Sequence, residues 1–144
     1  MNDGFGHWFA GFVDGEGCFT IPEHKHNGCL YCRLRIQLRV DDRPLLEYIQ
    51  EQTGLGVVRT LGRRYGTSQL QAYWAVSRKA DCLALVDLLD AYPLRSKKRY
   101  DYEVWREAVL LWNTSRQGVT FDWSGLRILA DQIRTVRVFH ETPV

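Results

Sequence analysis

Residues 8–19 read WFAGFVDGEGCF, and this stretch decides the fold. Its apolar residues, together with Phe5, follow the i, i+3, i+4, i+7 spacing of one buried helical stripe. Glycines interrupt the same helix, and each costs about 1 kcal/mol relative to alanine in a helix interior. Gly11 and Gly15 are four residues apart and therefore share one face. Small residues at this spacing predict that a second helix packs closely against that face.

Two carboxylates, Asp14 and Glu16, lie at the C-terminal end of this predicted helix. The helix dipole is negative at that end, so an acid there opposes the local field. A nearby cation would compensate for the unfavourable position, and a metal ion is one such cation. The alternative is that both acids only cap the turn between the helix and the next strand.

Residues 9–17, FAGFVDGEG, resemble the LAGLIDADG motif of a family of homing endonucleases. The chain differs in having Phe9 for the first leucine, Gly15 for the usual alanine and Glu16 for the second aspartate. The resemblance implies a site-specific endonuclease that makes a double-strand break in DNA by metal-dependent phosphodiester hydrolysis, with Mg²⁺ as the cofactor. Family members with a single motif are homodimers, and the motif occurs once here, so the resemblance also implies a homodimer.

The length of 144 residues suits one domain, 1–144, with a sizeable core. A hydrophobic fraction of 45% and a charged fraction of 25% favour a soluble globular protein. We expect no membrane association, since no apolar run is long enough and no signal-peptide core is visible. The expected location is intracellular, in a bacterial or phage-host cytoplasm or an organelle matrix. The irregularly spaced cysteines are expected to be reduced thiols.

Residues 30–40 form the clearest predicted strand, because apolar and polar residues alternate along it. Its polar positions carry Tyr31, Arg33, Arg35, Gln37 and Arg39. Arginines along one strand face repel each other, and a polyanion in front of the sheet would relieve this repulsion. Arginine and glutamine are also the side chains that read guanine and adenine in the major groove. We therefore favour a nucleic-acid surface over a merely solvated one, although the net charge is only +2.

The other periodicities predict an α+β protein with the order α-β-β-α-β-β-α, followed by C-terminal helices. After the first helix, the predicted elements are strands 18–26 and 30–40, helix 43–53, strands 56–64 and 69–78, and helices 79–91, 97–112 and 124–138. This order matches the LAGLIDADG fold, in which two hairpins form a curved antiparallel sheet with helices packed behind it. The tryptophans on apolar faces are predicted to lie in the core; they are Trp74, Trp105, Trp112 and Trp123.

The resemblance assigns chemical roles to a few residues. Glu16, with the backbone at Gly15, is the expected metal ligand. The segment 93–98, PLRSKK, resembles the part of the family that supplies a basic residue near the scissile phosphate. Lys98 is the best match for that catalytic residue and Lys97 the second. The family also has a polar residue after the second strand that orients water; Asp41 and Asp42 are the candidates, and neither is preferred.

The remaining expected site residues lie on predicted surfaces of the protein. The expected DNA-binding residues are His24, His26, Arg33, Arg35, Gln37, Arg39, Arg59, Arg63, Arg64, Gln69, Gln71 and Tyr73. The expected dimer interface consists of His7, Ala10, Gly11, Asp14 and Gly15.

Other functions and sites stay open at this point. A zinc site at His24, His26, Cys29 and Cys32 is disfavoured, because strand alternation places Cys32 with the core residues. A glycosidase pair at the two motif acids lacks any feature that sets the required carboxylate spacing. On the same fold, the chain could instead be an intron maturase or a non-cutting DNA-binding regulator. A carboxylate beside phosphate argues against the regulator, because a binder does not need one.

Overall fold

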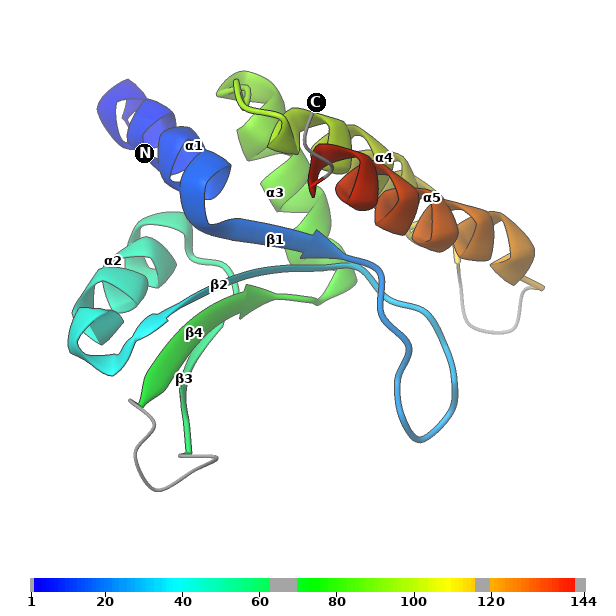
Figure 1. The fold of residues 1–144 in the computed structure, drawn as a ribbon, viewed down its shortest axis with the longest axis horizontal. Helices are drawn as coiled ribbons and strands as arrows, with labels where there is room; N and C mark the ends of the chain where they lie inside the picture. Colours follow the sequence, from blue (N-terminus) through cyan, green and yellow to red (C-terminus); the bar gives the residue numbers. More distant parts are fainter. Residues whose placement is uncertain (1, 63–69, 116–119, 142–144) are drawn as a thin grey trace.

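The computed structural model describes residues 2–62, 70–115 and 120–141. Its elements are α1 (Asp3–Glu16), β1 (Gly17–Thr20), β2 (Arg33–Arg39), the 3-10 turn η1 (Val40–Asp42), α2 (Arg43–Thr53), β3 (Val57–Leu61), β4 (Gln71–Val76), α3 (Lys79–Ala91), α4 (Lys98–Trp112) and α5 (Trp123–Glu141). The predicted α+β order is therefore confirmed, and the chain continues into two C-terminal helices (Figure 1).

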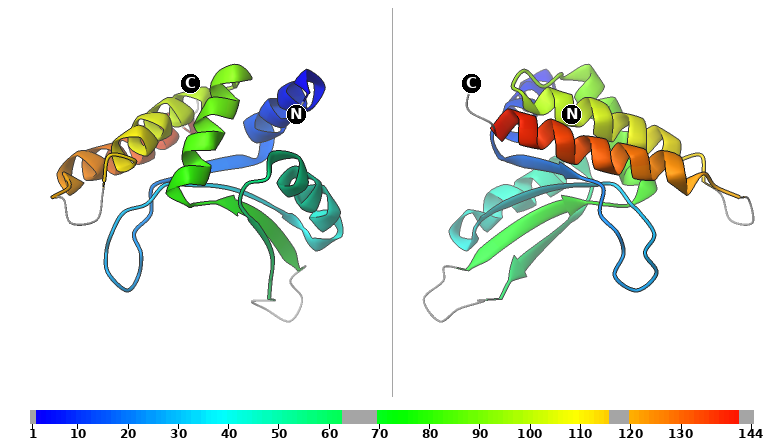
Figure 2. Two further views of the ribbon diagram at one scale, coloured as in Figure 1. Left: turned by 180° about the vertical axis from the view of Figure 1, so that it is seen from behind. Right: turned by 45° about the vertical axis from the view of Figure 1, so that its right-hand side comes forward.

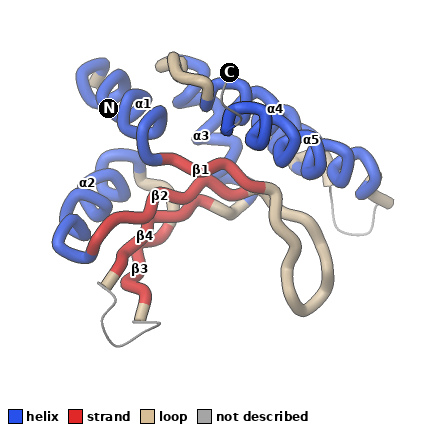
Figure 3. Tube along the Cα trace, viewed as in Figure 1, coloured by secondary structure: helices blue, strands red, loops and turns tan. Residues whose placement is uncertain are grey.

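The strands form one antiparallel sheet in the order β1-β2-β4-β3. The sheet is curved, and the helices lie on one of its sides (Figures 1 and 3). Two further views agree: the opposite side faces away from every helix of the described chain (Figure 2). This uncovered side is the open face of the sheet.

Alternation along the strands separates the core from the open face. Leu34 and Ile36 of β2 and Trp74 of β4 are fully buried on the helical side. They pack with Phe9, which comes from the apolar stripe predicted for the first helix, and with Val13 of the same helix. Side chains at the alternate positions of the same strands must point to the open face. The period-two pattern in the sequence therefore assigns the two faces correctly.

Three of the four tryptophans are buried as predicted, but the prediction for Trp123 is wrong. Trp123 is the first residue of α5, and its side chain is 40% exposed. Its ring packs edge-on against Phe121, with 4.7 Å between ring centroids. The buried stripe of α5 begins only with Leu126, one turn later.

The predicted strand 18–26 is wrong in its second half, because β1 ends early and the β1–β2 loop, residues 21–32, follows. Pro22 has no N–H to donate to a strand ladder. An isolated antiparallel bridge between Glu23 and Leu30 is the only strand pairing in this loop. The loop projects from one end of the sheet, on the side away from the helices (Figure 1).

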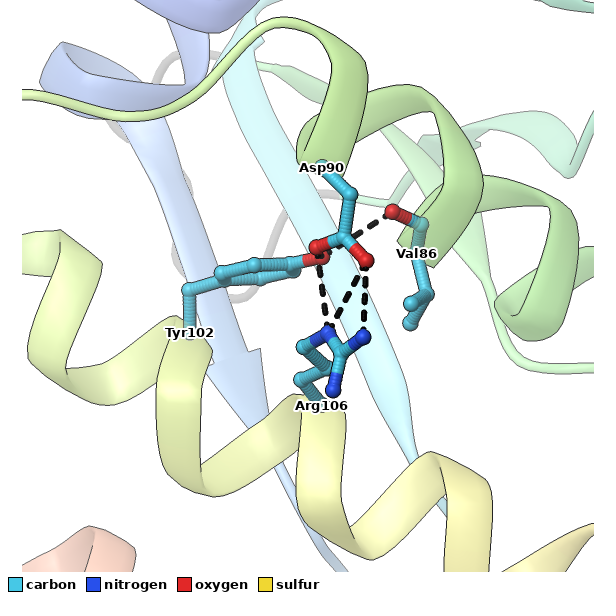
Figure 4. A network of polar contacts seen from close by, with 4 residues as sticks. All are labelled: Val86, Asp90, Tyr102 and Arg106. Carbon is cyan, nitrogen blue, oxygen red and sulfur yellow. Dashed lines mark hydrogen bonds and ion pairs between the residues drawn. The ribbon is translucent and has the colours of Figure 1, made fainter.

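A polar contact fastens α3 to α4 (Figure 4). Arg106 donates to both oxygens of Asp90, at 3.1 and 3.0 Å, and the Tyr102 hydroxyl lies 2.7 Å from Asp90 and 3.1 Å from the Val86 carbonyl oxygen. Burial alone would raise the pKa of Asp90, but the hydrogen bonds from Arg106 and Tyr102 outweigh it and lower that pKa.

Among the helices of the described residues, none combines the length and the apolar character that a bilayer crossing requires.

Candidate metal and nucleic-acid site

The end of α1 presents an exposed carboxylate. Glu16 is the last residue of the helix, and its side chain is exposed. Within the described ranges, the Glu16 carboxylate makes no hydrogen bond and no ion pair. Gly15 is also exposed, and a Cβ placed there would have no neighbour within 4 Å. Carboxylate and carbonyl oxygens are the ligand types that Mg²⁺ prefers.

The other motif acid, Asp14, is fully engaged by a distant segment. Its carboxylate accepts hydrogen bonds from the backbone N–H of Arg95 at 3.0 Å and of Ser96 at 3.0 Å. The Ser96 hydroxyl donates to the same carboxylate at 2.7 Å. This contact, the Asp14 clamp, joins the end of α1 to the segment directly before α4.

The Asp14 clamp explains why an acid tolerates the negative end of its own helix. The carboxylate lies at the C-terminal end of α1 but also at the N-terminal end of α4, where the helix dipole is positive. The N–H donors of this segment supply compensation for the Asp14 carboxylate. The metal ligands implied by the resemblance, Glu16 and the backbone at Gly15, stay a prediction. The sequence alone does not identify Ser96 as the partner of Asp14, although Ser96 is the hydroxyl residue nearest to the predicted helix start.

The same clamp fixes the backbone that carries the two candidate lysines. The Ser96 hydroxyl accepts a hydrogen bond from the Lys98 N–H at 3.2 Å while it donates to Asp14. Lys98 is half-buried and Lys97 is exposed. Two hydrogen bonds thus connect the Lys98 backbone to the helix turn that ends in Glu16.

One residue of the dimer interface predicted on α1, Ala10, is not accessible to a partner. Ala10 is 4% exposed and belongs to the core, so it cannot contribute substantially to a contact with a partner. His7, Gly11 and Gly15 are exposed and Asp14 is half-buried, which leaves one accessible stripe along the helix. The stripe is flat at Gly11, because a Cβ there would also meet nothing within 4 Å.

The open face of the sheet brings the predicted polar residues into rows. Gln37 of β2 lies opposite Tyr73 of β4, which in turn lies opposite Arg59 of β3. Arg39 lies opposite Gln71 in the next row. Directly opposed residues of an antiparallel pair share a face, so these rows run across the sheet. The result is a surface of cationic and amide groups.

Like charges lie close together in the centre of this surface. Arg35 lies over the ring of Tyr73, 4.1 Å from its centroid, and donates to Gln37 at 2.8 Å. Partial burial lowers the pKa of Arg35, and the positive charge of Arg33 lowers it further. The Nε atoms of Arg33 and Arg35 are buried and have no hydrogen-bond partner among the described residues. A polyanion on this face would relieve both features.

The β1–β2 loop carries the two predicted histidines. His24 stacks on Tyr31, with 4.1 Å between ring centroids, and His26 lies 5.6 Å from His24. Three further predicted DNA-binding residues, Arg63, Arg64 and Gln69, lie outside the described residues.

The zinc alternative has no geometric support from the described chain. Cys32 is fully buried, and burial raises the pKa of its thiol. His24 and His26 are exposed in the loop. Within residues 2–62, 70–115 and 120–141, no group of three or more His, Cys, Asp or Glu side chains could hold a metal ion.

Comparison with known proteins decides the family. Residues 9–109 match the sequence model of the LAGLIDADG endonuclease family. The chain belongs to this family. The match begins at Phe9, the first residue of the motif, and runs through β4 and α3 into α4. In this LAGLIDADG protein, the start of α1, the end of α4 and all of α5 lie outside the matched region.

Individual relatives of this LAGLIDADG protein agree with the assignment. A probable intron-encoded endonuclease, Cox1-I1b of Schizosaccharomyces pombe, is 29% identical over 110 residues, which are 74% of this chain and 27% of the relative. The LAGLIDADG meganuclease I-AabMI, solved bound to uncleaved DNA, is 30% identical with a TM-score of 0.65 over 79% of this chain and 38% of its own. The chain thus spans about a quarter of the curated relative's length and well under half of I-AabMI.

A second solved structure matches over nearly its whole length. The homing endonuclease I-TnaI has a TM-score of 0.65 at 21% identity, and the match covers 90% of this chain and 97% of that chain. At this identity the likeness shows the fold only. It shows that one copy of the fold can make up nearly an entire polypeptide.

Proposed function

We propose that this LAGLIDADG protein is a site-specific endonuclease that cuts both strands of duplex DNA by phosphodiester hydrolysis. The observation that carries the proposal is the carboxylate of Glu16 at the end of α1, one residue before the sheet whose open face is cationic; it is exposed and has no partner among the described residues. A DNA-binding module would not need a free acid next to phosphate, because such an acid repels it.

The open face of the sheet would hold the DNA. Arg35, Arg39 and Arg59 supply positive charge toward the phosphates, and Gln37 and Gln71 supply amide groups suited to base edges. A two-stranded or wider ribbon fits the major groove. The arginine repulsion described above favours a bound polyanion over an empty surface. Binding should therefore weaken steeply as salt concentration rises.

The family implies a divalent cation, and the residues present fit Mg²⁺ as half of a site. Glu16 and the backbone at Gly15 would hold the ion, since both are accessible oxygen donors. One chain supplies too few protein ligands, so a second fold unit and DNA phosphate oxygens would complete the coordination. When bound, the ion would supply Lewis-acid stabilisation of the leaving oxygen and a more acidic water.

The lysines would act on charge that develops at the phosphate. The Asp14 clamp holds the backbone of Lys98 at the N-terminal end of α4, and Lys97 precedes it. A lysine there would stabilise negative charge in the transition state or help to activate water. Asp14 itself would position this segment and would bind no metal, because its oxygens already accept three hydrogen bonds.

A second copy of the chain would pack against the stripe of His7, Gly11 and Gly15. Two-fold symmetry would bring two Glu16 carboxylates near each other, one for each DNA strand. Glycines let two helix backbones approach closely, and this packing would offset the lower helix propensity of glycine. The protein would act in the compartment that holds its DNA target, a bacterial or phage-host cytoplasm or an organelle matrix.

Replacing one carboxylate by its amide tests the proposal. Glu16→Gln should lower the cleavage of a randomised duplex library with Mg²⁺ by at least about a thousandfold, the order of a lost charge-stabilising contact. Binding of the same DNA in a gel-shift assay should change less than about threefold. Glu107→Gln on the exposed side of α4 removes an equal charge and serves as the control. A Glu16→Gln protein that still cuts at the wild-type rate would refute the assignment.

A further inference from the structure

The base and the returning half of the β1–β2 loop lie near α5, a helix that the family match does not include. Arg127 of α5 forms an ion pair with Glu23 of the loop. An open cavity of about 440 Å³ separates the first turns of α5 from the returning half of the loop; it is lined by Asn27, Gly28, Cys29, Leu30, Trp123, Ser124 and Arg127.

A second cavity continues the same contact toward the sheet. It has a volume of about 210 Å³, and α5 contributes Ala130, Ile133 and Arg134 to its lining. The opposite wall is formed by the start of the loop and by Arg33 on β2. Residues of α5 therefore lie near the base of the loop and near its returning half.

The loop itself is internally ordered and presents a polar tip. The His24 N–H donates to the Cys29 carbonyl at 2.9 Å, and the Tyr31 N–H donates to the Pro22 carbonyl at 3.0 Å. The Gly28 N–H closes the turn by donating to the His24 carbonyl at 2.8 Å. These bonds connect the outgoing and returning halves of the loop, so a contact at Glu23 also bears on the residues opposite it.

We propose that α5, through Arg127 and Trp123, is a positioning element that fixes the orientation of this hairpin on DNA. The residues it would orient are His24, Lys25 and His26 at the tip, so α5 would set the preference for base pairs beyond those read by the sheet. The inference rests on the proposed function. Its physical basis is preorganisation: a recognition loop that is already held in place loses less freedom on binding.

The expected effect is local, because the ion pair is half-exposed. The side chains of Arg127 and Glu23 are 43% and 46% exposed, and such pairs typically change an equilibrium by about two- to fivefold. This is too small to unfold the protein. It is large enough to alter which orientation of the hairpin dominates.

The first experiment measures amide hydrogen exchange in the free protein. Arg127→Met should lower the protection of the His24, Gly28 and Tyr31 amides about two- to fivefold. The reversed pair Glu23→Arg with Arg127→Glu keeps the net charge and should restore protection. Ile128→Ala is the control on the same helix, because the Ile128 side chain is 65% exposed and lines neither cavity. Unchanged protection in Arg127→Met, or no recovery in the reversed pair, would overturn the proposal.

The second experiment selects bound sequences from a randomised duplex library. Arg127→Met should keep the wild-type preference at most positions and relax it about two- to fivefold at one contiguous end of each half-site. An unchanged profile, or an equal loss at all positions, would overturn the positioning role. A wild-type protein that selects no duplex would instead refute the proposed function. The exchange result does not depend on DNA, so the two failures are distinguishable.

Discussion

Helix α1 and its C-cap contain two pairs of glycines with opposite surroundings. A Cβ at Gly6 would lie 2.3 Å from the nearest side-chain atom of the same chain, and a Cβ at Gly17 would lie 2.8 Å from one. A Cβ at Gly11 or Gly15 would meet nothing within 4 Å. The first pair is therefore required by the packing of this chain alone, whereas the second pair is not.

Contacts within the chain explain the glycine at position 6 but not the glycines at positions 11 and 15. Each glycine inside a helix costs about 1 kcal/mol relative to alanine. At Gly6 a close approach to Tyr92 accounts for the cost. No contact among the described residues accounts for it at Gly11 or Gly15. A partner that packs against Gly11 and Gly15 would account for this cost. The contrast between the two glycine pairs therefore supports the proposed second copy.

The largest effect should come from filling the open pair. Gly11→Leu places a bulky side chain where two helix backbones would meet, so it should raise the dissociation constant of the dimer at least about a hundredfold, or about 2.7 kcal/mol. Sedimentation velocity over a dilution series measures this constant. Leu110→Ala, an exposed change on α4, is the control. A Gly11→Leu protein that dimerises as tightly as the wild type would place the interface elsewhere.

The next largest effect should come from filling the packed pair. Gly17→Ala puts a methyl group 2.9 Å from the Val13 carbonyl oxygen, a backbone atom that cannot rotate away. Overpacking of this kind should lower the free energy of unfolding by about 1–3 kcal/mol, as measured by urea denaturation. Gly15→Ala is the same chemical change two residues earlier and should not destabilise. If both variants lost the same free energy of unfolding, the packed and the open glycine pairs would not differ in their surroundings within the chain.

The smallest effect should have the opposite sign. At concentrations where the chain is monomeric, Gly11→Ala should raise the free energy of unfolding by up to about 1 kcal/mol, because alanine is the better helix former and has open space. The same substitution should weaken dimerisation. Destabilisation of the monomer by Gly11→Ala would mean that a contact within the chain already occupies this face.

The sequence was sufficient for the fold and for the open face of the sheet, because both follow from local periodicity. Alternation along 30–40 assigns Arg35 and Gln37 to one side and Ile36 to the core, and the register then aligns Gln37 with Tyr73. Local patterns were also enough to place α1 and its accessible stripe.

Features that depend on distant partners could not be predicted in the same way. The sequence places Asp14 at an unfavourable helix end but does not show that a segment near Ser96 supplies its donors. Ala10 looks like a small interface residue until the core closes over it. Trp123 lies on an apolar pattern, yet the pattern does not reveal where the buried stripe of α5 begins. In each case the missing information is a tertiary neighbour.

The Asp14 clamp also has a consequence for the order in which the protein becomes active. It joins residues 81 and 82 positions apart in the chain, so it can form only after the sheet and α3 have brought those segments together. Until then Glu16 at the end of α1 and the lysines at the start of α4 are separate, and a newly made or partly unfolded chain holds no assembled site. For the endonuclease proposed above, hydrolysis would therefore require the finished fold, and incomplete states of the chain would leave DNA uncut.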